Sequence, residues 1–153
     1  KRKLAYEVFG ATHVVDPTAV DPVDAVLEAT WNRGADVSIA TPGVLTQAIL
    51  AQALQALGKG GRAVLVAVPP AGADHLPIAP FDVVMFERQI LGTVYGSSNP
   101  FSDIPQLIDL YQSGKLKLDE LVTNTYSLDQ INEGYEAMLA GRNIRGLVIL
   151  SDD

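Results

Sequence analysis

The chain has 153 residues, of which 48% are hydrophobic, and this composition predicts a folded domain with a packed core rather than a disordered chain. Its 11 Lys and Arg against 18 Asp and Glu give a net charge of −7, which argues against nucleic acid as the main partner. The absence of cysteine excludes disulfides and thiolate metal sites within the chain. No apolar run reaches the ~20 residues that span a bilayer and no signal peptide is visible, so we expect a cytoplasmic protein without a membrane partner.

Helical and extended patterns alternate in the first half of the chain. A helix over residues 1–9 ends at Gly10, a second helix opens at Asp21-Pro22 and ends before Gly34, and a third helix spans residues 43–57. The apolar face of the second helix is predicted to comprise Val23, Val26, Leu27 and Trp31. Strands are predicted at residues 12–15, 36–40 and 62–68, the last after a tight glycine turn over residues 58–61.

The second half contains shorter elements. Helices are predicted at residues 82–87, at 100–113 before Gly114, and at 127–140, the last opened by the capping box of Ser127 and Gln130 and ended by Gly141. Strands are predicted at residues 89–95, 122–126 and 146–150, and a short edge strand at residues 75–79.

Strands that alternate with helices imply right-handed crossovers and a parallel sheet. The sequence therefore predicts an α/β protein with a Rossmann-like parallel sheet and flanking helices. Because no strand or glycine-rich turn precedes the first helix, we expect the fold to lack its N-terminal βα unit, which carries the pyrophosphate-binding turn. We expect a partial Rossmann domain over residues 1–96 and a C-terminal segment over residues 97–153, with the boundary near the polar turn at 96–99.

Three motifs follow predicted strands at their carboxyl ends, where open α/β sheets bind ligands. They are ATPG at residues 40–43, VAVPP at 66–70 and GTVYG at 92–96. Their small residues would let a flat ligand approach the backbone. A turn that opens the next helix explains the first motif as well, and an ordinary exit from a strand explains the second. Tyr95 in the third motif is more typical of a core or interface residue than of a catalytic acid.

Arg145, just before the last strand, is a candidate phosphate-binding residue because its planar guanidinium suits phosphate. A structural ion pair is the alternative. Arg142 competes for the same role but is more typical of a surface charge at a helix end. The two histidines, His13 and His75, have no neighbours at metal-ligand spacing, so we assign neither a metal nor a general base to them.

Five segments together resemble the zinc-dependent alcohol dehydrogenases of the medium-chain dehydrogenase/reductase superfamily, in the order and at the spacing of that family. They are KRKLAYEVFGATHVVDP, GADVSIATPG, LGKGGRAVLVAVPP, ILGTVYGS and SLDQINEGYEAMLAGRNIRGLVIL. The similarity is greatest to the branch of animal-type and glutathione- or mycothiol-linked formaldehyde dehydrogenases. The resemblance implies an oxidoreductase that transfers hydride between an alcohol or aldehyde and a nicotinamide coenzyme, NAD or NADP, with zinc in the parent enzyme.

The resemblance also implies roles for individual residues. Arg2, or Lys1, would lie near the adenosine ribose, and Thr41 with Pro42 beside the adenine. Backbone groups of Val66, Val68, Thr93 and Tyr95 would line the nicotinamide pocket, and Arg145 would bind the pyrophosphate. The strand near residues 75–79 would pair across a two-fold axis in a homodimer, although Pro77 shortens it.

The chain departs from the family pattern by omission, because it has no zinc-ligand set, no GxGxxG and no acidic residue in place to bind the ribose 2′-hydroxyl. We therefore assign no catalytic residue, expect the 153-residue chain alone to be inactive, and leave the choice between NAD and NADP open. Two other functions remain: a zinc-free quinone or enoyl reductase of the same superfamily, and a non-catalytic α/β binding module.

Overall fold

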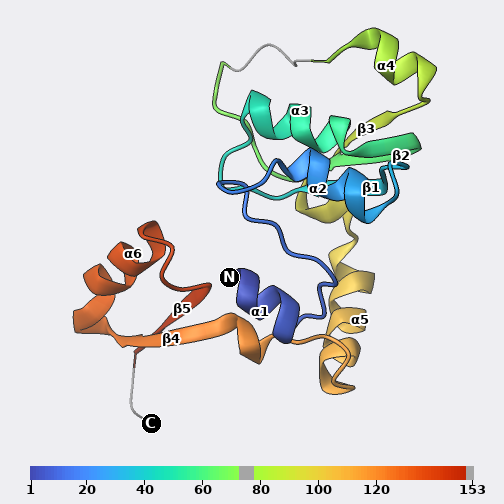
Figure 1. Ribbon diagram of the computed structural model, residues 1–153. Helices are drawn as coiled ribbons and strands as arrows, with labels where there is room; N and C mark the ends of the chain where they lie inside the picture. The colour runs from blue at the N-terminus through green and yellow to red at the C-terminus, as the bar shows by residue number, and fades with distance from the viewer. Residues whose placement is uncertain (73–77, 151–153) are drawn as a thin grey trace. The chain divides into compact units, whose positions relative to one another are not determined.

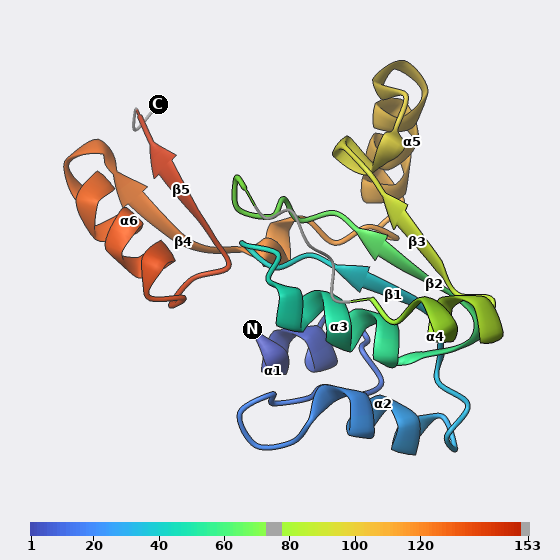
Figure 2. The same ribbon diagram turned by 90° about the horizontal axis from the view of Figure 1, so that it is seen from above.

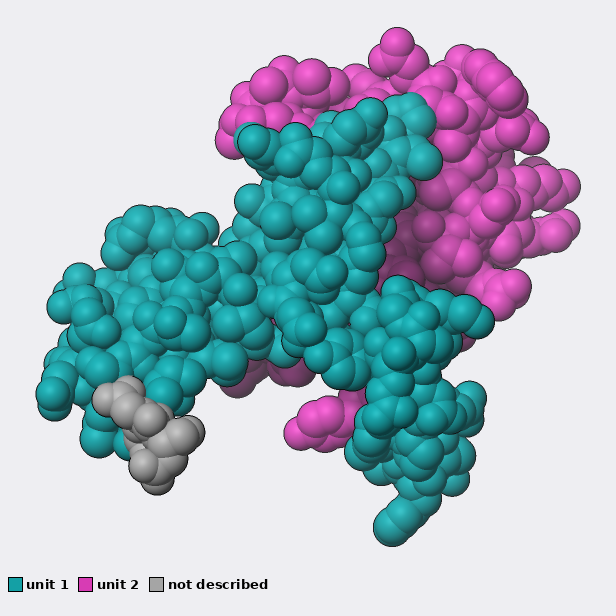
Figure 3. Space-filling model, turned by 90° about the horizontal axis from the view of Figure 1, so that it is seen from below, with its two compact units in different colours: residues 1–14, 99–153 teal, residues 15–98 magenta. Residues whose placement is uncertain are grey.

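The computed structural model describes residues 1–72 and 78–150 (Figure 1). Contacts divide the chain into two compact units, one of residues 15–98 and one of residues 1–14 together with 99–153, which Figure 3 shows in different colours. Among the described residues, no helix is long and apolar enough to cross a membrane.

Residues 15–98 form a three-stranded parallel sheet in the order β1-β2-β3, which confirms the predicted α/β class with parallel strands. The strands are β1 (Ala35–Ala40), β2 (Leu57–Leu65) and β3 (Gln89–Gly92). Ala40 pairs with Leu65, and Leu65 pairs with Gly92, so the three strands end at the same level. Their carboxyl ends therefore form one edge of the sheet, which Figure 2 shows from above.

One face of this sheet is covered by α3 (Gln47–Gln55), whose Leu50 and Leu54 pack in the core. The remaining buried core residues are Ala40, Leu45, Leu57 and Ala63. The Ser38 hydroxyl donates a hydrogen bond to the Ala53 carbonyl of α3 at 2.8 Å. The opposite face carries Val37, Ile39 and Leu91, which are exposed.

Side-chain caps fix where two helices of this unit begin. The predicted start of α2 (Pro22–Ala29) is confirmed, because the Asp21 carboxylate accepts the Val23 N–H at 2.7 Å with Pro22 at the first helical position. The predicted start of α3 at residue 43 is four residues too early. The hydroxyl of Thr46 accepts the Ile49 N–H at 3.3 Å, and this cap begins the helix at Gln47.

The predicted glycine turn over residues 58–61 is a bulge inside β2. Ala35 pairs with Leu57 but Val37 already pairs with Arg62, so β2 accommodates several extra residues there. Gly60 takes the left-handed conformation, with φ of +74°. The bulge lets β2 begin directly after α3 instead of after a separate loop.

Other element boundaries also differ from prediction. The strand predicted at residues 12–15 does not form, because those residues pair with no strand of the described chain. Trp31 lies beyond the end of α2 with φ of +52° and is 81% exposed, so it is not part of the apolar face of that helix.

The strands β2 and β3 end at Leu65 and Gly92, earlier than predicted. The α4 helix (Pro80–Met85) covers most of its predicted range, whereas most of the predicted strand at 75–79 lies outside the described residues.

The second unit contains α1 (Arg2–Glu7), α5 (Pro100–Gln112) and a two-stranded parallel sheet of β4 (Val122–Ser127) and β5 (Arg145–Ile149). The connection between β4 and β5 runs through α6 (Ile131–Leu139), which packs on both strands (Figure 1). The predicted capping box of Ser127 and Gln130 is present, and it opens a short 3₁₀ turn, η3 (Leu128–Gln130), that leads into α6. The Lys117 ammonium donates a hydrogen bond to the Val8 carbonyl at 2.7 Å, which ties the segment after α5 to α1.

Candidate functional site

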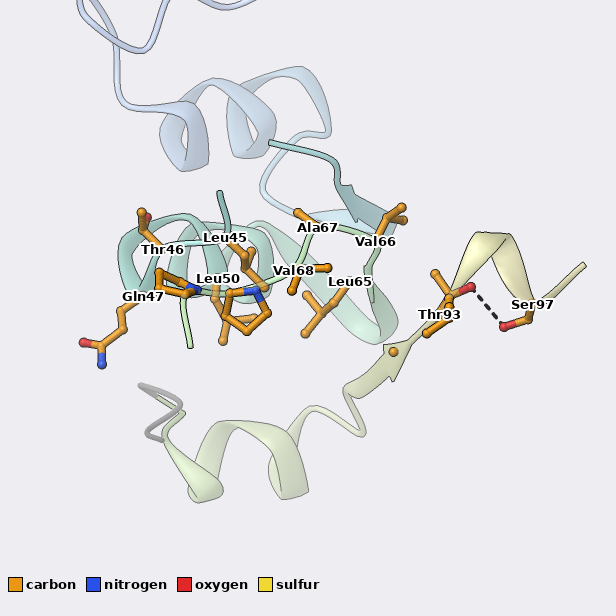
Figure 4. A pocket seen from close by; sticks show the side chains of 14 residues that line it. Leu45, Thr46, Gln47, Leu50, Leu65, Val66, Ala67, Val68, Thr93 and Ser97 are labelled. Atoms are coloured by element: carbon orange, nitrogen blue, oxygen red, sulfur yellow. Dashed lines mark hydrogen bonds between the residues drawn. The ribbon is translucent and has the colours of Figure 1, made fainter. Parts of the chain in front are cut away.

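A cavity of about 800 Å³ lies at the carboxyl ends of β2 and β3, beside the start of α3 (Figure 4). All of its lining residues belong to the unit of residues 15–98. They are Leu45, Thr46, Gln47, Leu50, Leu65, Val66, Ala67, Val68, Pro69, Pro70, Gly92, Thr93, Val94 and Ser97. This is the edge of a parallel sheet at which α/β folds bind ligands, and a volume of this size is typical of small-molecule sites.

Backbone hydrogen bonds hold the segment after β2, which lines this cavity. The Ala40 carbonyl at the end of β1 accepts the N–H groups of Val66 at 3.1 Å and Ala67 at 3.2 Å. The N–H of Leu45 donates to the Val68 carbonyl at 3.4 Å. The segment after β2 is therefore held against both the end of β1 and the residues before α3.

The end of β3 forms another wall. The Thr93 N–H donates to the Leu65 carbonyl at 3.1 Å, which extends the strand pairing by one residue. The hydroxyls of Thr93 and Ser97 are hydrogen-bonded at 2.9 Å, as the dashed line in Figure 4 shows. Ser97 ends a single 3₁₀ turn, η1 (Tyr95–Ser97), so this bond fixes the turn against the strand.

The walls are mainly apolar, and two positions make room for a flat group. Ala67 has only a methyl side chain, and a Cβ built on Gly92 would meet no other atom within 4 Å. Because Gly92 pairs with Leu65 and lines the cavity, the space that a larger side chain at 92 would occupy is open. The arrangement suits a planar ring with a few hydrogen-bonding groups at its edge.

The predicted site residues of this unit divide into two groups. Val66, Val68 and Thr93 line the cavity. Thr41 and Pro42 directly follow β1 but are not among its lining residues, and neither is Tyr95, which is 94% exposed. Sequence reasoning missed the contribution of the residues around the start of α3, Leu45 to Gln47. The helical cap at Thr46 was a usable signal, because it places the start of α3 beside the strand ends.

Arg2 and Arg145 lie in the other unit, as the first residues of α1 and β5. Arg145 is exposed, and it lines a second cavity of about 330 Å³ between α6 and the β4–β5 sheet. Tyr126, Tyr135 and Met138 supply apolar surface to this cavity.

No group of three or more His, Asp or Glu side chains within residues 1–72 and 78–150 is placed to share a metal ion. The described part of the chain thus offers no donor set for zinc. In the second unit, the hydrogen bond from Tyr111 to the Asp119 carboxylate, together with the negative charge of that carboxylate, raises the pKa of Tyr111 above its ordinary value of 10.0. None of the residues that line the cavity of the first unit has a titratable side chain.

Known proteins resemble this chain over nearly its whole length. The model of a family described as zinc-binding dehydrogenase matches residues 1–113. An NDMA-dependent alcohol dehydrogenase of Amycolatopsis methanolica is 39% identical over 153 residues, which cover 100% of this chain and 41% of that protein.

Solved structures agree with this relationship. The benzyl alcohol dehydrogenase of Acinetobacter calcoaceticus superposes with a TM-score of 0.89 at 33% identity, over 98% of this chain and 40% of the other. A zinc-binding dehydrogenase of Sinorhizobium meliloti 1021, solved with NADP bound, has a TM-score of 0.80 at 32% identity, over 97% and 42% of the two chains. The chain thus spans about two fifths of the length of the proteins it matches.

Proposed function

The chain belongs to the zinc-binding dehydrogenase family, and from this premise we propose that it is the coenzyme-binding part of a longer alcohol dehydrogenase. The parent enzyme would transfer hydride between an alcohol or aldehyde and a nicotinamide coenzyme. We assign residues 1–96 to the coenzyme domain and residues 97–153 to a segment that returns to the catalytic domain.

The observation that carries this proposal is the apolar cavity at the carboxyl ends of two neighbouring strands of a parallel sheet, β2 and β3. The open space at Gly92 would accommodate a planar ring such as nicotinamide. The NADP named with the Sinorhizobium meliloti structure supports a coenzyme of this class. Both NAD and NADP remain candidates, because the residues that distinguish the ribose 2′-hydroxyl from a 2′-phosphate are not identified in this chain.

When bound, a nicotinamide coenzyme supplies or accepts the hydride. The contribution of this chain is to bind and orient it. Backbone groups of Val66 and Val68 would line the nicotinamide pocket, and backbone groups of Thr93 and Tyr95 would bind the carboxamide of the ring. Arg145 would bind the diphosphate with charge-assisted hydrogen bonds, and Arg2, Thr41 and Pro42 would lie along the adenosine.

Zinc does not fit the residues that the structure describes. The sequence has no cysteine, and the described residues bring no three suitable side chains together. We propose that the zinc of the parent is held entirely by other parts of that protein, and no step is assigned to zinc here. We also propose that the parent is cytoplasmic and forms a homodimer.

The exposed face of the sheet supports a longer parent. Parallel sheets are usually covered on both faces, whereas Val37, Ile39 and Leu91 are exposed here.

A non-catalytic binding module is the second candidate function, and the same cavity would serve it. A longer reading frame that encodes cysteine and histidine zinc ligands would favour the dehydrogenase. One that encodes a glycine fingerprint without such ligands would favour a zinc-free reductase.

The test uses the purified parent protein. Binding of NAD and of NADP is measured by calorimetry, and alcohol oxidation is followed by coenzyme reduction with benzyl alcohol as the first substrate. The activity assay is repeated with NDMA as the oxidant, since the name of one relative states dependence on it. We expect saturable binding of one coenzyme. A parent that binds neither NAD nor NADP would overturn the proposal.

A further inference from the structure

Arg145 lies opposite an irregularity in β4. Val122 pairs with Arg145 but Asn124 already pairs with Gly146, so Thr123 is an extra residue with no partner of its own in β5. This is a β-bulge, which bends a strand locally and redirects the side chains near it. Bulges are enriched next to functional sites for that reason.

The extra residue contacts the backbone on both sides of the Arg145 nitrogen. The Thr123 hydroxyl accepts the Ile144 N–H at 3.0 Å, and it lies 3.5 Å from the Arg145 carbonyl, to which it can donate. A single hydroxyl group thus bridges the Asn143–Ile144 and Arg145–Gly146 peptide groups, which lie on either side of the Ile144–Arg145 pair.

A buried amide holds the other end of the same segment. Asn143 is only 5% exposed, and its Nδ2 donates to the Tyr126 hydroxyl at 3.4 Å. A Cβ on Gly146 would lie 2.8 Å from Cε2 of Tyr126 and 3.0 Å from Nδ2 of Asn143. The backbone of Gly146 therefore packs directly on this pair, and the residues flanking Ile144 and Arg145 are both fixed.

The Arg145 side chain, by contrast, is exposed. Within the described residues, no carboxylate forms an ion pair with it. A rigid backbone that carries an exposed guanidinium is the arrangement expected of a preorganised anion-binding residue.

We propose that Thr123 and Asn143 are positioning residues, which fix the Arg145 backbone so that its guanidinium meets the diphosphate of the coenzyme. This inference rests on the proposed function. It concerns residues that hold the backbone around Arg145 and not residues that contact the coenzyme.

The experiment measures binding of ADP-ribose, which contains the diphosphate, and of adenosine, which does not, to the parent protein by calorimetry. Thr123→Val removes the hydroxyl at nearly constant volume, Thr123→Ser keeps it, and Thr125→Val is the matched control on the same strand. We expect Thr123→Val to weaken ADP-ribose binding about 2- to 10-fold, the fold-change that corresponds to one neutral hydrogen bond. Adenosine binding, Thr123→Ser and Thr125→Val should match wild type.

A double-mutant cycle separates positioning from general structure. If Thr123 acts through Arg145, Thr123→Val should cause little further loss in an Arg145→Ala background. Two outcomes would overturn the positioning role and leave the proposed function intact. One is an equal loss of ADP-ribose affinity from Thr123→Val in both backgrounds. The other is wild-type binding of ADP-ribose by Thr123→Val when Arg145→Ala binds it weakly. Wild-type binding by Arg145→Ala would overturn the diphosphate role of Arg145 and the positioning role with it. A parent that binds no ADP-ribose at all would contradict the coenzyme-binding function itself.

Discussion

The guanidinium of Arg88 donates a hydrogen bond to the backbone carbonyl of Leu57, a residue that is only 1% exposed. The same guanidinium stacks over the Phe86 ring, with its Cζ 4.9 Å from the ring centroid. The Phe86 carbonyl in turn accepts the Gly60 N–H at 2.7 Å. These contacts join the bulge of β2 to the turn before β3, and they fix the register that brings both strands to the cavity at the same level.

Arg88→Met should therefore destabilise the unit of residues 15–98. The substitution leaves the Leu57 carbonyl buried without that donor, and an unsatisfied buried acceptor costs about 1–3 kcal/mol. The measurement is the free energy of unfolding in urea. Lys59→Met on the same bulge is the control, because its 3.9 Å ion pair with Glu87 is exposed and should contribute little. Equal stability of Arg88→Met and wild type would show that the register does not depend on this bond.

Gly92→Val should weaken coenzyme binding by the parent without destabilising the fold. Valine suits a strand, and its side chain would fill the open space at the cavity wall. Forcing a ring against that side chain should cost about 1–3 kcal/mol, or roughly 5- to 150-fold in affinity.

The readout for Gly92→Val is calorimetric titration with coenzyme together with thermal unfolding. Gln89→Val is the control, at the other end of the same strand and away from the cavity. Unchanged affinity of Gly92→Val would mean that the ring binds elsewhere.

The uncovered sheet face gives a third prediction. Ile39 is 63% exposed in this chain, and in the parent we expect it to be buried under the rest of the doubly wound fold. Ile39→Asp should then destabilise the parent by about 3 kcal/mol or more, since it would bury an unpaired charge. The isolated 153-residue chain should tolerate the substitution. Urea unfolding of both proteins tests this, and equal effects in both would argue against a covered face.

Much of the fold was predictable from sequence because its signals are local. The capping box of Ser127 and Gln130 and the proline after Asp21 each fix a helix start within a few residues. Parallel pairing followed from the alternation of strands with helices. The misplaced features depend on distant partners: residues 12–15 need a neighbouring strand in order to form one, and the glycines of the β2 bulge are positioned by Phe86 and Arg88.

The candidate site was partly predictable for a related reason. Val66, Val68 and Thr93 follow strands directly, so the rule that ligands bind at the carboxyl ends of parallel strands was enough to find them. The roles of Thr123 and Asn143 were not visible, because a bulge and a buried amide bond only appear once β4 and β5 are paired.

Arg145→Ala in the parent should weaken coenzyme binding more than it changes the chemical step. A charge-assisted contact to a diphosphate is worth about 1.5–3 kcal/mol, or roughly 10- to 150-fold in affinity. Arg145→Lys should recover only part, because an ammonium lacks the planar paired donors of a guanidinium. Arg142→Ala serves as the neighbouring control. Titration with coenzyme decides the matter, and wild-type affinity for Arg145→Ala would assign that arginine a structural role instead.

Tyr111 gives the last prediction, which concerns pH. Its hydroxyl donates to both oxygens of the Asp119 carboxylate, at 2.8 and 2.9 Å, and this joins the end of α5 to the turn before β4. The bond and the carboxylate charge raise the pKa of Tyr111 above its ordinary 10.0, because ionisation would lose the donor and place two negative charges together. The stabilisation is therefore fully present below pH 10 and is lost as the pH rises through the pKa of the folded state. A difference titration of tyrosinate absorbance between wild type and Tyr111→Phe should show a midpoint above 10, which Asp119→Asn should lower toward the ordinary value. A midpoint at or below 10 in wild type would contradict the bond.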